Sequence, residues 1–274
     1  MTTPAPFGLL LDVDGPIASP IERRIAIDSI VSDLLTMAAA GIPIAFITGR
    51  SDDFMREHVV APLVAGGLDA HSHVFGVFEK GGAWAPVTPQ GLGELEIDAQ
   101  VAVPEALRVA VESLAREHYA DTMFIDEGKH VMISLEQHID VPSPVFAEAQ
   151  KRCVDEIVRL MTELSVGPAF RIDPTIISID VEAVLLDKDL GAHRALDWFA
   201  ARGVSAERWW SMGDSRSDYL MADAVHARGI PVAHVDVRPG DGMLERPYDV
   251  VVEGDLIHDA AGAAFLRRRV AELA

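Results

Sequence analysis

Short apolar runs alternate with amphipathic stretches at both ends of the chain, and this alternation predicts the secondary structure there. Apolar residues recur at helical spacing through residues 21–40, and Gly41 and Pro43 provide a helix stop. Apolar runs that end in polar or glycine residues predict buried strands. Strands are expected at 7–11, 42–47, 74–78, 209–212, 230–235 and 248–252, with helices at 21–40, from Asp52, at 190–201, after Asp218 and at 257–273. Such alternation is typical of a parallel sheet with right-handed crossovers.

A different pattern occupies the middle of the chain. Proline and glycine residues at 86–93 predict a linker, and a helix–strand–strand pattern then occurs twice in succession. The helices are expected at 104–118 and 144–164, and the strands at 122–125, 131–135, 170–172 and 176–181. This order predicts a small α+β domain with an antiparallel sheet. We therefore expect an α/β fold, in which a Rossmann-like parallel core of residues 1–85 and 186–274 carries an inserted α+β domain at 86–185.

The composition restricts the class of partner. Lys and Arg number 23 against 43 Asp and Glu, which gives a net charge of −20. Nucleic acids and anionic membranes are bound by basic surfaces, so we expect neither as a partner. A phosphorylated small molecule remains compatible with this charge, because its site needs only a few local cations or a metal. The N-terminus lacks a signal-peptide pattern and no apolar run approaches the roughly 20 residues of a membrane span, so a cytoplasmic protein is expected.

Carboxylates and a hydroxyl group lie where three of the predicted strands end. Asp12 and Asp14 follow the first strand, Thr48 follows the second, and Asp214 and Asp218 follow a later one. Ligands of open α/β sheets bind outside the carboxyl ends of the strands, so these residues are candidates for one site. Asp12 and Asp14 point the same way, because side-chain direction repeats every two residues, and they repel each other unless a cation or proton lies between them. An ordinary Asp-Gly turn after a strand is the simpler interpretation.

Lys188, at the predicted start of a core helix, completes a set of residues suited to phosphoryl transfer. The carboxylate oxygens of Asp12, Asp14 and Asp214 are hard ligands that suit Mg²⁺. The metal lets an anionic carboxylate approach an anionic phosphate, and one aspartate can then form an aspartyl-phosphate that water hydrolyses. Thr48, neighbouring backbone N–H groups and the Lys188 ammonium would hold the non-bridging phosphate oxygens.

Four short motifs resemble, in order, those of the haloacid dehalogenase superfamily. They are Leu10-Leu-Asp-Val-Asp-Gly15, Ile47-Thr-Gly-Arg50, Lys188 and Gly213-Asp-Ser-Arg-Ser-Asp218. The resemblance covers roughly residues 7–85 and 186–274. The α+β domain between the second and third motifs resembles the cap of the subclass that holds sucrose- and trehalose-phosphate phosphatases, Cof-like phosphatases and phosphomannomutases. The resemblance implies that this cap sets substrate specificity.

The resemblance also implies different roles for the four aspartates. Asp12 would be the nucleophile, and Asp14 the general acid/base that protonates the leaving alkoxide and then activates water. Asp12 and Asp214 would ligate Mg²⁺ through their side chains and Asp14 through its backbone carbonyl, while Asp218 supports the metal or its waters. Asp218 also matches a helix capping box, which is its alternative role. Pro16 departs from the family pattern, in which Thr or Val usually stands there, and puts the shape of the turn in doubt.

The other motif residues are expected around the phosphate. By the resemblance, Thr48 binds phosphate, and Gly49 and Arg50 lie beside it on the same turn. Lys188 would steady both the nucleophile and the phosphoryl oxygens.

Three basic residues have alternative roles. Arg50 either touches the substrate or pairs with Asp52 or Asp53, which open the next helix. Lys80 and Arg216 either contact the substrate or lie on the surface, and the sequence does not decide between these alternatives.

The expected activity is that of a Mg²⁺-dependent phosphatase that hydrolyses a small phosphorylated metabolite through an aspartyl-phosphate. The type of cap favours a sugar phosphate. Asp14 favours phosphatase or phosphomutase chemistry over dehalogenation, since a leaving alkoxide needs a proton. One alternative is a phosphomutase, which returns the phosphoryl group to a reoriented sugar. The other is a binding protein on an inactive core, which would have lost Asp12, Asp14 or Lys188. The sequence gives no indication of the oligomeric state.

Overall fold

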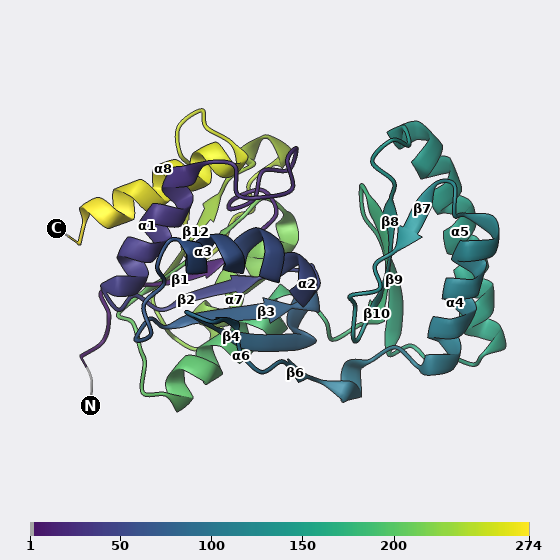
Figure 1. The fold of residues 1–274 in the computed structure, drawn as a ribbon, viewed down its shortest axis with the longest axis horizontal. Coiled ribbons are helices and arrows are strands. Elements are labelled where there is room, and N and C mark those ends of the chain that lie inside the picture. Colours follow the sequence, from purple (N-terminus) through teal and green to yellow (C-terminus); the bar gives the residue numbers. More distant parts are fainter. Residues whose placement is uncertain (1–2, 274) are drawn as a thin grey trace. The chain divides into compact units, whose positions relative to one another are not determined.

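The computed structural model describes residues 3–273, and the chain divides into two compact units (Figure 1). The larger unit comprises the chain up to Glu96 and from Asp187 onward, and the smaller unit comprises Ile97–Leu186. The first boundary therefore falls later than the expected position after residue 85. The reason is that two strands, β4 (Ala83–Thr88) and β5 (Gly91–Leu92), belong to the sheet of the larger unit, where the sequence predicts a linker.

The larger unit is built on one sheet with the order β13-β12-β11-β1-β2-β3-β4-β5, and β6 (Glu96–Ile97) pairs with β4. The parallel strands are β1 (Gly8–Leu11), β2 (Ile44–Ile47), β3 (Val74–Phe78), β11 (Trp209–Gly213), β12 (Val232–Asp236) and β13 (Asp249–Val251). β4 and β5 extend the sheet in antiparallel fashion beyond β3. The predicted α/β fold with a mostly parallel sheet is confirmed.

Helices cover both faces of this sheet (Figure 1). α1 (Asp28–Ala39) and α8 (His258–Ala271) pack on the face that carries Leu9 and Leu11 of β1. α6 (Lys188–Ala201) and α7 (Tyr219–Ala227) pack on the face that carries Leu10. Because both faces are covered, β1 is buried throughout and needs an unbroken apolar sequence. After β2, α2 (Asp52–Met55) continues through a π-helical turn at Arg56–Val60 into α3 (Ala61–Ala65).

The first helix is shorter than predicted. α1 begins at Asp28, so the expectation that it starts at residue 21 is wrong. The apolar residue that suggested an earlier start, Ile21, is 88% exposed and contributes nothing to the core. The preceding segment instead turns back on itself, with the Ser19 N–H donating to the Arg24 carbonyl at 2.9 Å, and Arg23 adopts a left-handed conformation that ends any helical run.

The smaller unit is a four-stranded antiparallel sheet covered by two long helices. Its strands have the order β7-β8-β10-β9 and are β7 (Met123–Ile125), β8 (Ile133–Gln137), β9 (Phe170–Pro174) and β10 (Ser178–Ala183). α4 (Glu105–His118) and α5 (Ser143–Glu163) supply apolar residues to a core shared with Ile133, Leu135, Ile179 and Val181. The intervening strand residues point to the opposite face, where polar side chains gather. The predicted pairs of strands are confirmed.

The sheet order of the larger unit brings distant chain segments together. β1 lies between β11 and β2, and Leu11 is level with Met212 on one side and Phe46 on the other. The Asp12 N–H extends the pairing by donating to the Met212 carbonyl at 2.9 Å. The loops after these three strands therefore begin at one edge of the sheet. Within residues 3–273, none of the helices is both long and apolar enough to cross a membrane.

Candidate active site

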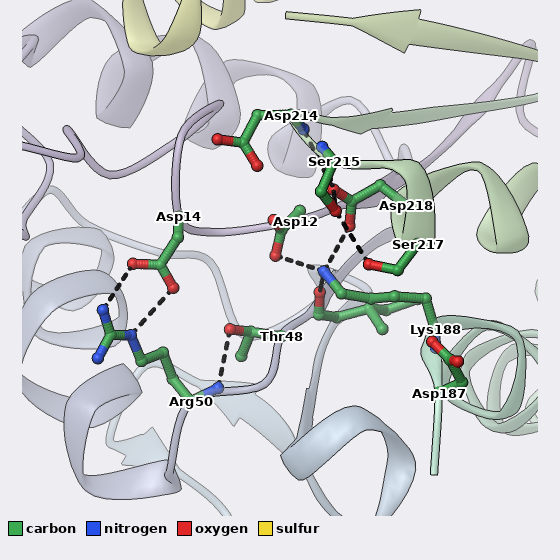
Figure 2. Close-up of polar contacts among 11 residues, drawn as sticks. Asp12, Asp14, Thr48, Arg50, Asp187, Lys188, Asp214, Ser215, Ser217 and Asp218 are labelled. Carbon is green, nitrogen blue, oxygen red and sulfur yellow. Dashed lines mark hydrogen bonds and ion pairs between the residues drawn. The ribbon is translucent and has the colours of Figure 1, made fainter. Parts of the chain in front are cut away.

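Lys188 connects two of the aspartates that follow strand ends (Figure 2). Its Nζ lies 2.6 Å from Asp12 Oδ1 and 2.6 Å from Asp218 Oδ1, and it donates to the Ile47 carbonyl at 3.0 Å. All three side chains are buried, so the ion pairs are shielded from solvent. Lys188 is the first residue of α6, and Asp187 fixes its backbone by accepting from the Lys188 N–H at 2.9 Å. The start of α6 thus places one ammonium group among carboxylates from two strand ends.

Asp218 has a structural role as well as its ion pair. Its Oδ2 accepts from the Asp214 N–H at 3.1 Å, the Ser215 N–H at 2.9 Å and the Ser215 hydroxyl at 2.7 Å. The bond from the Ser215 N–H, together with the return bond from the Asp218 N–H to the Ser215 side chain, forms the predicted capping box. Gly213 allows this close approach, since a Cβ there would lie 2.1 Å from the Cβ of Asp218. Both oxygens of Asp218 are therefore engaged by protein groups, whereas Asp12 and Asp214 offer oxygens that the capping interactions do not use.

Burial and like charges shift the pKa values of these groups. Burial, reinforced by Asp218 and only partly offset by Lys188, raises the pKa of Asp12 well above its ordinary value. The same two causes raise the pKa of Asp214 to about 6. Burial also opposes the charged form of Lys188, but the ion pairs with Asp12 and Asp218 outweigh it and raise its pKa. Asp218 has a lowered pKa despite its burial, because Lys188 and the Ser215 hydrogen bonds stabilise its carboxylate. The cluster therefore holds more carboxylates than one lysine can compensate.

The donor set fits a divalent cation. Asp12, Asp214 and Asp218 bring carboxylate oxygens within 4.8 Å of one another. A hard cation that prefers oxygen ligands would offset the burial and the like charges that raise the pKa of Asp12 and Asp214. Since Asp218 is already held by Lys188 and the capping box, Asp12 and Asp214 are the better candidates for direct ligands, with Asp218 in support.

Asp14 is held by Arg50 on the other side of the site (Figure 2). Arg50 donates from Nε to Asp14 Oδ2 and from Nη2 to Asp14 Oδ1, both at 3.0 Å. The Arg50 N–H also donates to the Thr48 hydroxyl at 3.1 Å, and the guanidinium lies over the Phe54 ring at 4.7 Å. The sequence does not predict this pair, since the alternatives it offers are the substrate and the neighbouring Asp52 and Asp53. Asp52 accepts from Arg56 Nε at 3.0 Å.

The turn that carries Asp14 is closely packed. Gly15 has φ +95°, and a Cβ there would lie 2.7 Å from Asp214 Cγ, so this position needs glycine for both conformation and space. The Ala18 N–H donates to the Val13 carbonyl at 2.7 Å and closes the turn. Pro16 packs against α8, where a Cβ on Gly262 would lie only 1.9 Å from the Pro16 carbonyl oxygen. The unusual Pro16 therefore lies in a well-defined turn, next to a glycine in the last helix.

Comparisons with known proteins identify the fold. No protein-family model matches the chain, and no curated protein matches its sequence. Solved structures do match. The trehalose-6-phosphate phosphatase of Aspergillus fumigatus has a TM-score of 0.57 and 18% identity, over 98% of this chain and 94% of that one. The C-terminal domain of C. albicans trehalose-6-phosphate phosphatase has a TM-score of 0.67 and 13% identity, over 97% and 92%. A haloacid dehalogenase-like hydrolase from Bacteroides thetaiotaomicron has a TM-score of 0.60 and 12% identity, over 97% and 99%. The chain has the haloacid dehalogenase fold.

Within this fold, the residues of the four motifs lie at one edge of the sheet. Asp12, Asp218 and Lys188 are in direct contact, and Asp14 and Thr48 are joined through Arg50. Gly49 lies beside Lys80, since a Cβ on Gly49 would be 3.7 Å from Lys80 Cε. The other open candidate, Arg216, is exposed.

Two further features of the site are absent from the sequence-based prediction. His258 at the start of α8 places Nδ1 3.6 Å from Asp214 Oδ2, and burial together with Arg238 lowers its pKa. Glu79 and Lys80 both have positive φ, at +50° and +54°, next to the Thr48 turn, where the Lys80 N–H donates to the Thr48 carbonyl at 2.9 Å. Strained backbone of this kind collects at functional sites. The sequence marks Lys80 as a possible substrate contact but not the positive φ angles, and no local signal marks His258, because its role depends on a contact with a distant segment.

Proposed function

We propose that the protein is a Mg²⁺-dependent phosphatase that hydrolyses a small phosphorylated metabolite through an aspartyl-phosphate on Asp12. The observation that carries the proposal is the buried contact of Asp12 with Lys188, 2.6 Å apart, beside Asp214 at the carboxyl edge of a parallel sheet. The fold shared with two trehalose-6-phosphate phosphatases supports the same chemistry. Asp12, Asp14 and Lys188 are all present, which disfavours the alternative of an inactive binding protein.

The residues have complementary roles in this reaction. A carboxylate oxygen of Asp12 forms a bond to phosphorus as the ester P–O bond breaks, and Lys188 holds Asp12 Oδ1 in place during the attack. Asp14 gives a proton to the leaving oxygen and then takes one from the water that attacks phosphorus and frees Asp12. The Thr48 hydroxyl and the Lys188 ammonium hold non-bridging oxygens. When bound, the cation held by Asp12, Asp214 and the Asp14 carbonyl, with Asp218 in support, would neutralise charge on the phosphoryl group.

The smaller unit is proposed to act as the cap that recognises the rest of the substrate. The face of its sheet that is turned away from α4 and α5 bears hydroxyl and carboxylate groups: Ser134, Glu136, Ser178, Asp180 and Glu182. Such groups suit the hydroxyls of a sugar, because the serine hydroxyls can donate or accept hydrogen bonds and the carboxylates can accept them. We therefore propose a sugar phosphate as the substrate class. A panel of phosphorylated sugars, nucleotides and glycerate derivatives tests this proposal, and a clear preference for a non-sugar phosphate would contradict it.

Hydrolysis of an aryl phosphate tests the activity itself. We expect phosphate release that requires Mg²⁺ and disappears in Asp12→Asn, because the amide cannot act as the nucleophile. Asp33→Asn is a matched control, because Asp33 on α1 is also a buried aspartate with a basic partner. It accepts from Arg267 Nε at 2.9 Å. Undiminished hydrolysis in Asp12→Asn would overturn the proposal. Release of free phosphate without a bisphosphate activator separates a phosphatase from a phosphomutase.

A further inference from the structure

We propose that Arg50 exchanges partners during turnover, pairing with Asp14 in the substrate-free protein and with the phosphoryl group once substrate is bound. The exchange would make the proton-transferring carboxyl group available only when substrate is present. It rests on the proposed function, because it concerns the acid/base Asp14 and the phosphoryl group of the same site.

The pair of Arg50 with Asp14 involves both carboxylate oxygens. Nε and Nη2 of the guanidinium each donate to a different Asp14 oxygen at 3.0 Å, which is the two-pronged geometry that a guanidinium forms with a carboxylate. In Figure 2 the Asp14 carboxylate is turned toward Arg50 and away from Lys188. While the pair lasts, both Asp14 oxygens accept from Arg50. In the proposed exchange the pair opens, at least in part, during each turnover, so that Asp14 can serve the leaving oxygen.

Neighbouring groups hold Arg50 where a phosphate would arrive. Its N–H donates to the Thr48 hydroxyl at 3.1 Å, and its carbonyl accepts from the Glu79 N–H at 3.1 Å. The guanidinium rests on the Phe54 ring, and only 13% of the Arg50 side chain is exposed. The backbone of Arg50 is thus fixed to the hydroxyl that is proposed to bind the phosphate, and the ring supports the guanidinium whichever anion it holds.

The two anions are suited to the same donor. The planar guanidinium matches the spacing of two oxygens in a carboxylate and in a phosphate equally well, whereas an ammonium lacks this fork. A phosphate dianion beside Thr48 can replace the Asp14 carboxylate on Arg50, so the guanidinium keeps a negative partner throughout. Asp14, 38% exposed, then becomes available to turn toward the leaving oxygen. Asp14 and phosphate should therefore compete for Arg50.

Binding of inorganic phosphate, measured by calorimetry with saturating Mg²⁺, tests this competition in a double-mutant cycle. Asp14→Asn is expected to tighten phosphate binding about tenfold, because one competitor is weakened, and Arg50→Met to weaken it about tenfold. In the Arg50→Met background, Asp14→Asn should change the affinity by less than about twofold. Arg50→Lys keeps the positive charge but lacks the two-pronged guanidinium. The effect of Asp14→Asn on phosphate affinity is therefore expected to be lost in this background as well.

Arg56→Met is the matched control, because Arg56 is the next arginine along the chain and also pairs with an aspartate, donating from Nε to Asp52 Oδ2 at 3.0 Å. It should leave the phosphate affinity within about twofold, because neither Arg56 nor its half-buried pair with Asp52 is part of the proposed phosphate site. If Asp14→Asn tightens phosphate binding equally in the wild-type and Arg50→Met backgrounds, Asp14 acts by like-charge repulsion alone and the exchange is wrong. If the wild-type protein hydrolyses aryl phosphate while the cycle is additive, only the exchange fails. A wild-type protein that neither hydrolyses nor binds phosphate with Mg²⁺ contradicts both proposals.

Discussion

Two groups of three carboxylates in this chain have similar dimensions and different surroundings. They are Asp12, Asp214 and Asp218 in the larger unit, and Asp173, Asp180 and Glu182 in the smaller one. In both groups the oxygens lie within 4.8 Å of one another. The first group comes from loops after parallel strands, and the second lies within neighbouring antiparallel strands, where Asp173 and Asp180 are directly opposite each other.

The two groups differ in how their charge is compensated. In the smaller unit, Arg171 donates from both Nε and Nη2 to Glu182 Oε1, and the Ser134 hydroxyl donates to Asp180. In the larger unit, a single Lys188 is shared between two carboxylates, and the pKa of Asp214 rises to about 6 because burial and Asp218 disfavour its charge. The distance between oxygens therefore does not distinguish a cation site from an acidic patch. The first group is the candidate cation site because burial and like charges raise the pKa of both Asp12 and Asp214, and a bound cation would favour their charged forms.

Removal of Lys188 should have the largest effect of any change in either group. Lys188→Met leaves Asp12 and Asp218 buried without their cation, so we expect a loss of about 3–5 kcal/mol in the free energy of unfolding without metal. The turnover number should fall about 10²–10³-fold, as when one donor to a transition-state oxygen is removed. Arg171→Met makes the matched change in the smaller unit. Urea unfolding and aryl phosphate hydrolysis measure both, and equal losses of turnover in the two variants would break the comparison.

Acid should destabilise the larger unit through His234. This side chain is fully buried on β12 and shares a hydrogen bond of 2.7 Å with the Ser211 hydroxyl, and burial lowers its pKa to about 4. His234 therefore binds a proton near pH 6.5 in the unfolded chain, but only near pH 4 in the folded chain. The contribution of neutral His234 to the free energy of unfolding is fully present above pH 6.5. It falls by about 3 kcal/mol as the pH drops toward 4.

Tryptophan fluorescence can follow this loss in one unit alone, since Trp84, Trp198, Trp209 and Trp210 all belong to the larger unit. Urea unfolding at pH 7.5 and pH 5 should show a lower free energy of unfolding at pH 5 in the wild type, and a smaller difference between the two pH values in His234→Gln. An identical dependence on pH in the variant would assign the effect to other groups.

Replacement of one carboxylate in each group should give the smallest and most specific effect. Asp214→Asn removes a proposed metal ligand, so the concentration of Mg²⁺ needed to raise the melting temperature should increase about tenfold or more. The metal-free protein should gain stability at neutral pH, because one repelling charge is lost. Asp180→Asn should leave the Mg²⁺ response within about twofold. A Mg²⁺ response that depends on Asp180 and not on Asp214 would reverse the proposed assignment of the two groups.

Local patterns in the sequence predict most of the fold. Apolar runs such as 42–47 identify parallel strands because these strands are buried on both faces, and the order of strand ends places Asp12, Thr48 and Asp214 at one edge. β4 is missed because Pro86 and nearby glycines suggest a linker. In the structure, burial alternates along this strand with Ala83, Ala85 and Val87 inward, and pairing with β3 overrides the proline.

The parts of the site that the sequence does not predict all depend on tertiary contacts. Arg50 reaches Asp14 across the ends of two strands, and His258 reaches Asp214 from a helix near the C-terminus. A motif fixes which residue types occur at a strand end, but it carries no information about which distant side chain completes the hydrogen bonds. The pair of Arg50 with Asp14 follows from the fold, since β1 and β2 are neighbours.

Pro16 and Gly262 are coupled by their close approach. A methyl group on Gly262 would overlap the Pro16 carbonyl, so a larger residue at position 262 must displace α8 or the turn that carries Asp14. The geometry at the beginning of the chain is therefore set partly by its last helix. The atoms that approach Gly262 belong to the backbone of residue 16, so glycine is expected at position 262 whichever residue occupies position 16. Truncation of the C-terminal helix should alter the turn of the first motif, although no residue of that motif is removed.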